Sequence, residues 1–314
     1  VHISIPSSVT TIGDNAFSGC LSLQQISIPS SILSISNTSF PGCLSLTQVS
    51  IPTSVVSIGN NAFSQCSSLT QISIPSSVTI IEDYSFCGCS SLAKIIIPES
   101  VTSLGEGTFF GCSSLVEVYI PSSIDSIGDC TFFGCSKLSE IEIPSSVTSI
   151  GKNAFNGCSS LKELNIPSSV TSIGNTAFMG CSSLKAMTIP SSVKMIGNQI
   201  FKDCSSLTQI ELNPNSTRIE NNSFQNCSSL SCLSITSITG NIEQFNQEPF
   251  SNMKTITISS SVTNICDNAF YENKRVEEIN LCDNISNIGS TSFSGCSSLT
   301  HIEIPSSVTN IGNN

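Results

Sequence analysis

Cysteine is the chemically reactive residue with the most regular spacing in this chain of 314 residues. Ten cysteines recur every 23 residues, and a phenylalanine precedes each of them by three positions. Such a row of thiols could form disulfides between neighbouring units, bind metal ions as a ladder, or fill a core. We favour the core, because each thiol holds a fixed place within an apolar repeat. The row consists of Cys20, Cys43, Cys66, Cys89, Cys112, Cys135, Cys158, Cys181, Cys204 and Cys227.

The remaining residues that could support catalysis or metal binding are scattered. Cys87 and Cys89 have no histidine nearby, and the two histidines, His2 and His301, stand at opposite ends of the chain. The sequence contains no Gly-x-Ser-x-Gly, no phosphate-binding loop and no His-Glu metal motif. We therefore predict that the protein is not an enzyme, with no catalytic residue, no metal site and no cofactor. Five cysteines outside the row share no spacing: Cys87, Cys130, Cys232, Cys266 and Cys282.

Carboxylates form a second column with the same interval. Glu117, Glu140 and Glu163 should lie about 5 Å apart on neighbouring units, where like charges oppose one another. This arrangement favours a basic partner or a cation, although Lys137 and Lys162 could neutralise it internally. Exposed apolar residues beside an acidic rim are typical of a binding patch. The predicted patch comprises Lys94, Ile96, Glu117, Tyr119, Glu140, Glu142, Glu163 and Asn165. The alternative is a solvated surface without a ligand.

Asn-x-Ser/Thr sequons are the other candidate surface sites. They would be glycosylated on a secretory route, but a chain rich in Ser and Asn also produces them by chance. The five sequons begin at Asn37, Asn215, Asn221, Asn226 and Asn284.

A 23-residue repeat must position all of these side chains. In the unit at residues 69–89, a Leu-x-x-Ile-x-Ile stretch alternates as a short strand does, and the following Pro removes a hydrogen-bond donor and ends the pairing. A Val-x-x-Ile segment then turns the chain, and Phe-x-x-Cys has the spacing of a tight helical turn with both side chains inward. These features predict an α/β solenoid of about 14 parallel strands on a concave face, with short helical turns or loops on the convex side.

The repeats extend over residues 1–314, so we predict a single array. Val1 and Asn314 both fall inside a repeat, which indicates a fragment of a longer array, with any signal or anchoring segment outside it. The repeats at the two ends of such a fragment would have exposed strand edges. Two copies of the chain could stack end to end through these edges and self-associate. In one irregular unit Gln247 replaces the phenylalanine and Phe250 replaces the cysteine, and we expect Phe250 to supply the missing aromatic volume.

Charge and hydropathy exclude several partners. The chain carries 11 basic and 22 acidic residues, which argues against binding nucleic acid or an anionic membrane surface. No apolar run approaches the roughly 20 residues that a membrane-spanning helix needs, so no membrane insertion is expected of this segment.

The repeat motif, seen at residues 138–158 and 161–181, resembles the BspA-like leucine-rich repeat of the treponemal class. The resemblance covers essentially the whole chain. It implies a surface protein of mucosal bacteria or protist parasites, extracellular or on the cell surface, that binds host cells, matrix proteins or other microbes. It implies no catalytic residues. We therefore expect an adhesion or recognition protein that binds a host cell-surface or matrix protein; the alternative is a structural spacer or an intracellular interaction scaffold.

Overall fold

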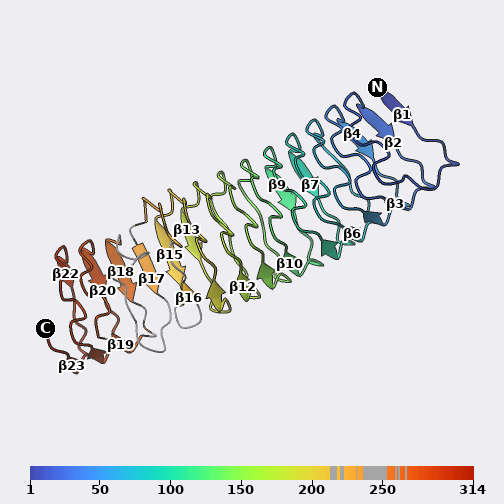
Figure 1. The fold of residues 1–314 in the computed structure, drawn as a ribbon. Helices are drawn as coiled ribbons and strands as arrows, with labels where there is room; N and C mark the ends of the chain where they lie inside the picture. The colour runs from blue at the N-terminus through green and yellow to red at the C-terminus, as the bar shows by residue number, and fades with distance from the viewer. Residues whose placement is uncertain are drawn as a thin grey trace.

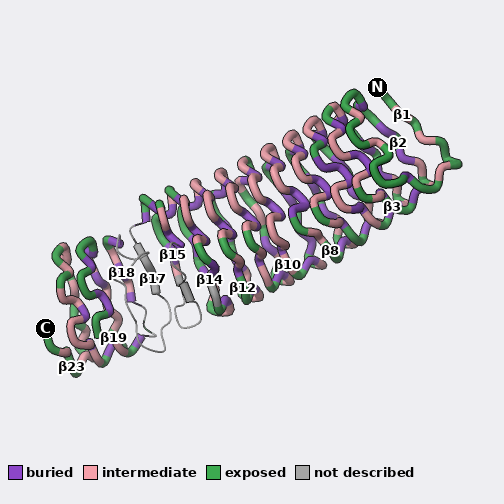
Figure 2. Tube along the Cα trace, viewed as in Figure 1, coloured by how far each residue is buried: buried purple, intermediate pink, exposed green. Residues whose placement is uncertain are grey.

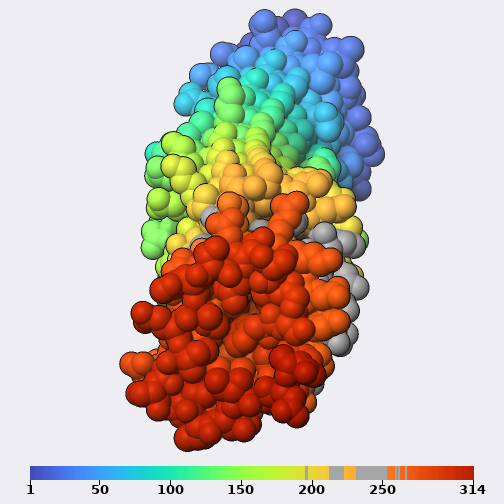
Figure 3. Space-filling model, turned by 90° about the vertical axis from the view of Figure 1, so that its left-hand side faces the viewer, coloured from blue at the N-terminus to red at the C-terminus, as the bar shows by residue number. Residues whose placement is uncertain are grey.

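The protein is an elongated stack of similar rungs with the chain ends at opposite ends of the stack (Figure 1). Figure 3 shows the same stack from its C-terminal end. The structure, a computed structural model, describes residues 1–212, 218–219, 223–230, 232–235, 253–258, 260, 262–265 and 267–314. Gln247, Phe250, Asn215, Asn221 and Cys266 lie outside the described residues, and so does the packing predicted for the irregular unit.

One row of parallel strands, here called the first sheet, forms from the Leu-x-x-Ile-x-Ile segments. Each strand pairs with its neighbour 23 residues further along, so that Ile26 lies opposite Val49. The first sheet contains β1 (His2–Ser4), β2 (Gln25–Ser27), β4 (Gln48–Ser50), β7 (Lys94–Ile96), β9 (Glu117–Tyr119), β13 (Ala186–Thr188), β15 (Gln209–Leu212), β17 (Cys232–Ile235), β18 (Thr255–Ile258), β20 (Glu278–Asn280) and β22 (His301–Ile302). The constant register confirms the predicted parallel solenoid with a 23-residue period.

The first sheet is interrupted in two places. Residues 71–73, 140–142 and 163–165 hold the corresponding places in their rungs but form no strand. The sheet therefore falls into three pieces, β1-β2-β4, β7-β9 and β13-β15-β17-β18-β20-β22. Among the described residues, the first sheet therefore has eleven strands, whereas the sequence predicted about 14.

A second row of two-residue strands, here called the second sheet, runs along another side of the stack and is hydrogen-bonded in three separate pieces (Figure 1). It forms from the Val-x-x-Ile segments, which the sequence predicted as turns, and its inward isoleucines, such as Ile35 and Ile58, are buried. Its strands are β3 (Ser34–Ile35), β5 (Ser57–Ile58), β6 (Ile80–Ile81), β8 (Ser103–Leu104), β10 (Ser126–Ile127), β11 (Ser149–Ile150), β12 (Ser172–Ile173), β14 (Met195–Ile196), β16 (Arg218–Ile219), β19 (Asn264–Ile265), β21 (Asn287–Ile288) and β23 (Asn310–Ile311).

The Phe-x-x-Cys segments are hydrogen-bonded turns, and the described part of the chain contains no helix. The predicted α/β class and helical turns are thus not confirmed. The reason lies in the backbone bonds, because alternate N–H groups donate outside their own rung. Cys43 donates within its turn to the carbonyl of Phe40, at 3.4 Å, whereas Phe40 and Gly42 donate to the carbonyls of Ala62 and Ser64 in the next rung, at 2.8 and 2.7 Å. Consecutive bonds within one turn, which a helix needs, cannot form.

Proline limits the length of the strands in the first sheet. Where Pro follows the strand segment, strands have at most three residues, as in β2 and β9. β15, β17 and β18, whose segments lack that Pro, each have four residues. β20, whose segment lacks it as well, has three. The additional pairs, such as Leu212 with Ile235, form between segments that both lack the Pro, as expected if proline ends the pairing by removing a donor.

Phenylalanine and cysteine form two buried columns along the stack. Phe rings from Phe17 to Phe224 are stacked in sequence, with neighbouring centroids 5.2 to 5.9 Å apart. From Cys43 to Cys227, each column thiol donates to a Phe carbonyl of the preceding rung, as Cys66 Sγ does to Phe40 O at 3.2 Å. Figure 2 shows buried residues recurring at the same places in successive rungs. The predicted core role of the cysteines is confirmed, and Cys66 and its column neighbours are free thiols.

Close contact between rungs explains the glycine at position 174 and gives a test of the packing. A methyl group on Gly174 would lie 2.5 Å from the backbone nitrogen of Lys152, whereas one on Gly128 would meet nothing nearer than 3.5 Å. We therefore expect Gly174→Ala to lower the free energy of unfolding by about 1–3 kcal/mol. The matched variant Gly128→Ala should change it by less than about 0.5 kcal/mol. Chemical denaturation compares the two variants, and equal stabilities would contradict the rung spacing described here.

Candidate functional site

The predicted patch lies on the outer side of the first sheet, at β7, β9 and the two rungs that follow. Side chains alternate along each strand, so Lys94 and Ile96 point outward and are exposed while Ile95 between them is buried. β9 repeats the pattern one rung further on. The fixed register therefore brings together side chains that are 23 residues apart in sequence.

Lys94 and Glu117 form an ion pair across these two strands. The Lys94 Nζ lies 2.9 Å from each carboxylate oxygen of Glu117. Both side chains are more than half exposed, at 54% and 64%, so the pair adds little stability. Its consequence is local neutralisation of Glu117. The sequence suggested that Lys137 and Lys162 could relieve the repulsion within the column of three glutamates, but neither makes an ion pair among the described residues.

Ile96 and Tyr119 provide the apolar part of the patch. They lie opposite each other in the β7–β9 register, and 57% of Ile96 and 49% of Tyr119 is exposed. Most large apolar side chains of this protein are buried in the stack, so an adjacent exposed pair on one sheet face is distinctive. Aromatic and aliphatic side chains of this kind are the usual anchors of protein interfaces.

Glu99 belongs to the patch but was missed by the sequence-based prediction. The Tyr119 hydroxyl donates to one of its carboxylate oxygens at 2.6 Å, and the Ser122 hydroxyl donates to the other at 3.1 Å. The Tyr119 bond is the main reason why the pKa of Glu99 is lowered, and the same bond raises the pKa of Tyr119. A signal was present, because Glu99 interrupts a column of Ser and Thr that otherwise follows each strand-ending proline.

The remaining predicted residues continue the surface across the next two rungs. Glu140, Glu142, Glu163 and Asn165 are all exposed, on segments that form no strand. Opposed like charges weaken strand pairing, but residues 71–73 also lack a strand without carrying a charge, so repulsion is not a general explanation. With Glu99, the patch has five carboxylates and one ammonium group. It can attract cations or basic side chains, and it has an apolar centre against which they can pack.

The other predicted sites are dispersed. Asn37, Asn226 and Asn284 are exposed, and their side-chain amides form hydrogen bonds to Asn60, Asp203 and Ser260 respectively. Within the described ranges, no group of three His, Cys, Asp or Glu residues is arranged to hold a metal ion. The described residues also contain no helix of the length and hydropathy needed to cross a membrane.

Comparison with known proteins gives the same architecture. The sequence matches the family described as BspA type leucine rich repeat region over residues 1–116, 57–185, 102–231 and 229–314. A leucine-rich repeat protein from Bacteroides ovatus is 28% identical, with a TM-score of 0.73 over 99% of this chain and 83% of that one. A leucine rich cell surface protein from Faecalibacterium prausnitzii is 27% identical, with a TM-score of 0.54 over 99% and 87% of the two chains. No curated protein is significantly similar in sequence.

Proposed function

Because this chain belongs to the BspA-type leucine-rich repeat family, we propose that it is a non-enzymatic recognition protein of the cell surface. Its partner is a host protein or matrix component, bound through the first sheet. Leucine-rich repeat proteins generally serve as scaffolds for protein interaction. The similar protein from Faecalibacterium prausnitzii is described as a cell surface protein, which supports the same location for this chain.

The observation that carries the proposal is the composition of the patch on β7, β9 and the next two rungs. Ile96 and Tyr119 form an exposed apolar pair, and carboxylates surround them. The Tyr119–Glu99 hydrogen bond holds the aromatic ring in place, so little side-chain entropy is lost when a partner packs against it. An acidic rim attracts basic partners and accelerates their association. The partner that best fits is therefore a protein with a basic, partly apolar surface.

The uniform register supports a second candidate function. Every pair of described neighbouring strands is parallel with a step of 23 residues, so the stack is regular enough to act as a spacer that sets distance. A spacer needs no binding patch. Substitutions in the patch should therefore impair a recognition protein but leave a spacer unaffected.

Charge reversal in the patch tests the recognition function. We expect Glu140→Lys together with Glu142→Lys to weaken binding to host cells or basic matrix proteins by about tenfold or more, because the rim would then repel a basic partner. The matched control, Glu278→Lys with Glu303→Lys, makes the same charge change at corresponding outward positions of β20 and the last rung. Binding is measured by surface plasmon resonance and by cell adhesion. An equal loss of binding affinity in both variants, or no loss in either variant, would contradict a binding site at the patch.

A further inference from the structure

A cavity opens in the first sheet at its N-terminal interruption, away from the acidic patch. It has a volume of about 480 Å³ and is lined by residues of β4, by Ile51 and by residues 71–73. An isolated bridge between Ser50 and Ser73 joins the two segments here. Where the strand pairing is lost, the inward-facing side chain of Ile72 is slightly more exposed. Its exposed fraction is 8%, compared with 1% for the equivalent Ile95 in the next rung.

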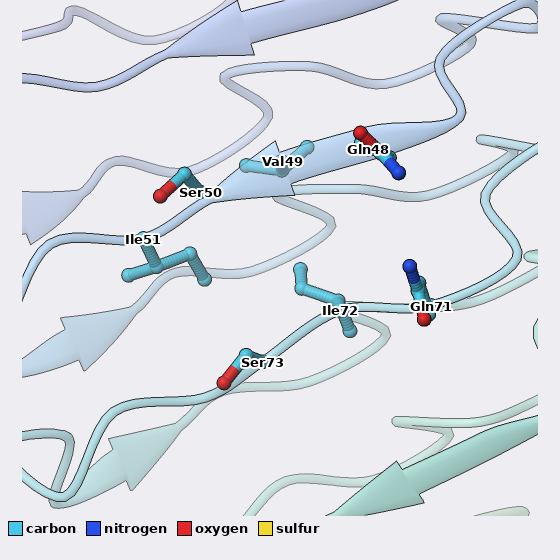
Figure 4. A pocket seen from close by; sticks show the side chains of 7 residues that line it. All are labelled: Gln48, Val49, Ser50, Ile51, Gln71, Ile72 and Ser73. Atoms are coloured by element: carbon cyan, nitrogen blue, oxygen red, sulfur yellow. The ribbon is translucent and has the colours of Figure 1, made fainter.

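The lining of the cavity is uncharged and polar at both ends. Figure 4 shows Gln48 and Gln71 at one end and Ser50 and Ser73 at the other, with Val49 and Ile72 between the two ends and Ile51 beyond Ser50. Each glutamine amide and serine hydroxyl can both donate and accept hydrogen bonds. The apolar part consists of Val49, Ile51 and Ile72. The volume falls in the range of about 300–1,000 Å³ that is typical of small-ligand sites.

The geometry excludes an inserted peptide strand as the occupant. On the other side of the same rungs, Ile58 and Ile81 pair directly in the second sheet, and the rings of Phe63 and Phe86 are stacked at 5.7 Å. These contacts hold the rungs one strand spacing apart, so no further backbone can enter between β4 and residues 71–73. A ligand must lie over the gap and make its contacts through side chains.

We propose that this cavity binds a neutral oligosaccharide. A sugar chain offers hydroxyl groups to the Gln and Ser side chains, and its C–H faces can pack against the apolar floor. None of the seven lining residues is charged, so an acidic or basic sugar finds no ion-pair partner here, and the site favours the hydroxyl groups of a neutral sugar. The site is independent of the acidic patch, so it can exist whether or not the protein binds a host protein there.

Ligand-observed NMR and calorimetry with four trisaccharides test the site. The neutral probes are maltotriose, cellotriose and triacetylchitotriose, and the charged probe is trigalacturonate. We expect saturable binding of at least one neutral probe and none of trigalacturonate. Gln48→Ala with Gln71→Ala should weaken that binding by about tenfold, because two hydrogen-bonding amides are lost. Gln209→Ala is the matched control, since Gln209 holds the same outward position on the fully paired strand β15.

A second variant blocks the cavity without relying on lost hydrogen bonds. Ser73→Tyr places a large ring over the gap, and the fold already accommodates tyrosine at the equivalent position 119. Binding should then be abolished while the thermal unfolding temperature stays close to that of the wild type. The proposal is overturned if no neutral probe binds, if binding survives in Ser73→Tyr, or if trigalacturonate or a neutral Gly-Ser peptide binds as well as the sugars.

Discussion

Raising the pH above about 9 is expected to unfold this protein cooperatively, because its column of buried thiols cannot ionise in the folded state. Burial raises the pKa of Cys89, Cys135 and Cys181 from an ordinary value of 9.0 to about 12. The unfolded chain loses these protons near pH 9, whereas the folded chain keeps them. The thiols therefore stabilise the fold fully below pH 9, and that stabilisation is lost progressively between about pH 9 and 12.

The effect is large because the thiols act together. Nine column cysteines are buried, and eight of them have a raised pKa; the exception is Cys43, whose pKa is lowered by its side-chain hydrogen bond with Cys66. Each of the eight lowers the free energy of unfolding by about 1.4 kcal/mol per pH unit in that range. Chemical denaturation at several pH values measures this slope. Cys158→Ala should reduce the slope by the contribution of one thiol, whatever its effect on stability at pH 7. Cys87→Ser, at a partly exposed cysteine, should change the slope much less. A pH-independent stability up to pH 11 would contradict the buried column.

The second large effect is expected from the stacked phenylalanines. Phe109 is fully buried between Phe86 and Phe132, with ring centroids 5.9 and 5.6 Å away. Phe109→Ala should lower the free energy of unfolding by about 3–5 kcal/mol, because it removes a buried ring and leaves a cavity in the middle of the stack. Since each rung contacts only its neighbours, unfolding should also become less cooperative, with the two halves separating.

Phe110 provides the control within the same rung. Its ring is only partly buried and is stacked on Phe133 at 4.6 Å on the outer surface. Phe110→Ala should therefore lower the free energy of unfolding by roughly 1 kcal/mol, which is the contribution of one surface aromatic pair. Differential scanning calorimetry compares both variants with the wild type. Similar decreases in stability for Phe109→Ala and Phe110→Ala would show that the buried column of phenylalanines is not the main source of stability.

The periodic parts of the fold could be predicted from the sequence because one interval determines them. A constant step of 23 residues fixes the parallel register, and the Phe and Cys columns follow from their constant offset within the repeat. The second sheet was missed because a two-residue strand is too short to show an alternating pattern. The helical turns were predicted from the Phe-x-x-Cys spacing alone, which does not reveal that alternate N–H groups donate to the next rung.

The surface was less predictable, because side chains there depend on neighbours that the repeat does not specify. The outward positions of the patch follow from strand alternation, but the ion pair that Glu117 forms with Lys94 was not predicted. Glu99 joins the patch through a hydrogen bond to Tyr119 across a loop. The cavity at residues 71–73 depends on a lost strand pairing that no feature of the local sequence indicates, since Gln71 and Ser73 repeat the residues of the paired rung before.

Direct binding of the purified protein to host cells and to matrix proteins, measured over a series of salt concentrations, is the most direct test of the recognition function. We expect saturable binding to at least one basic protein, and we expect its affinity to fall as salt screens the carboxylates around Ile96 and Tyr119. Binding to none of these partners at low salt would contradict recognition through the first sheet and would favour the spacer function.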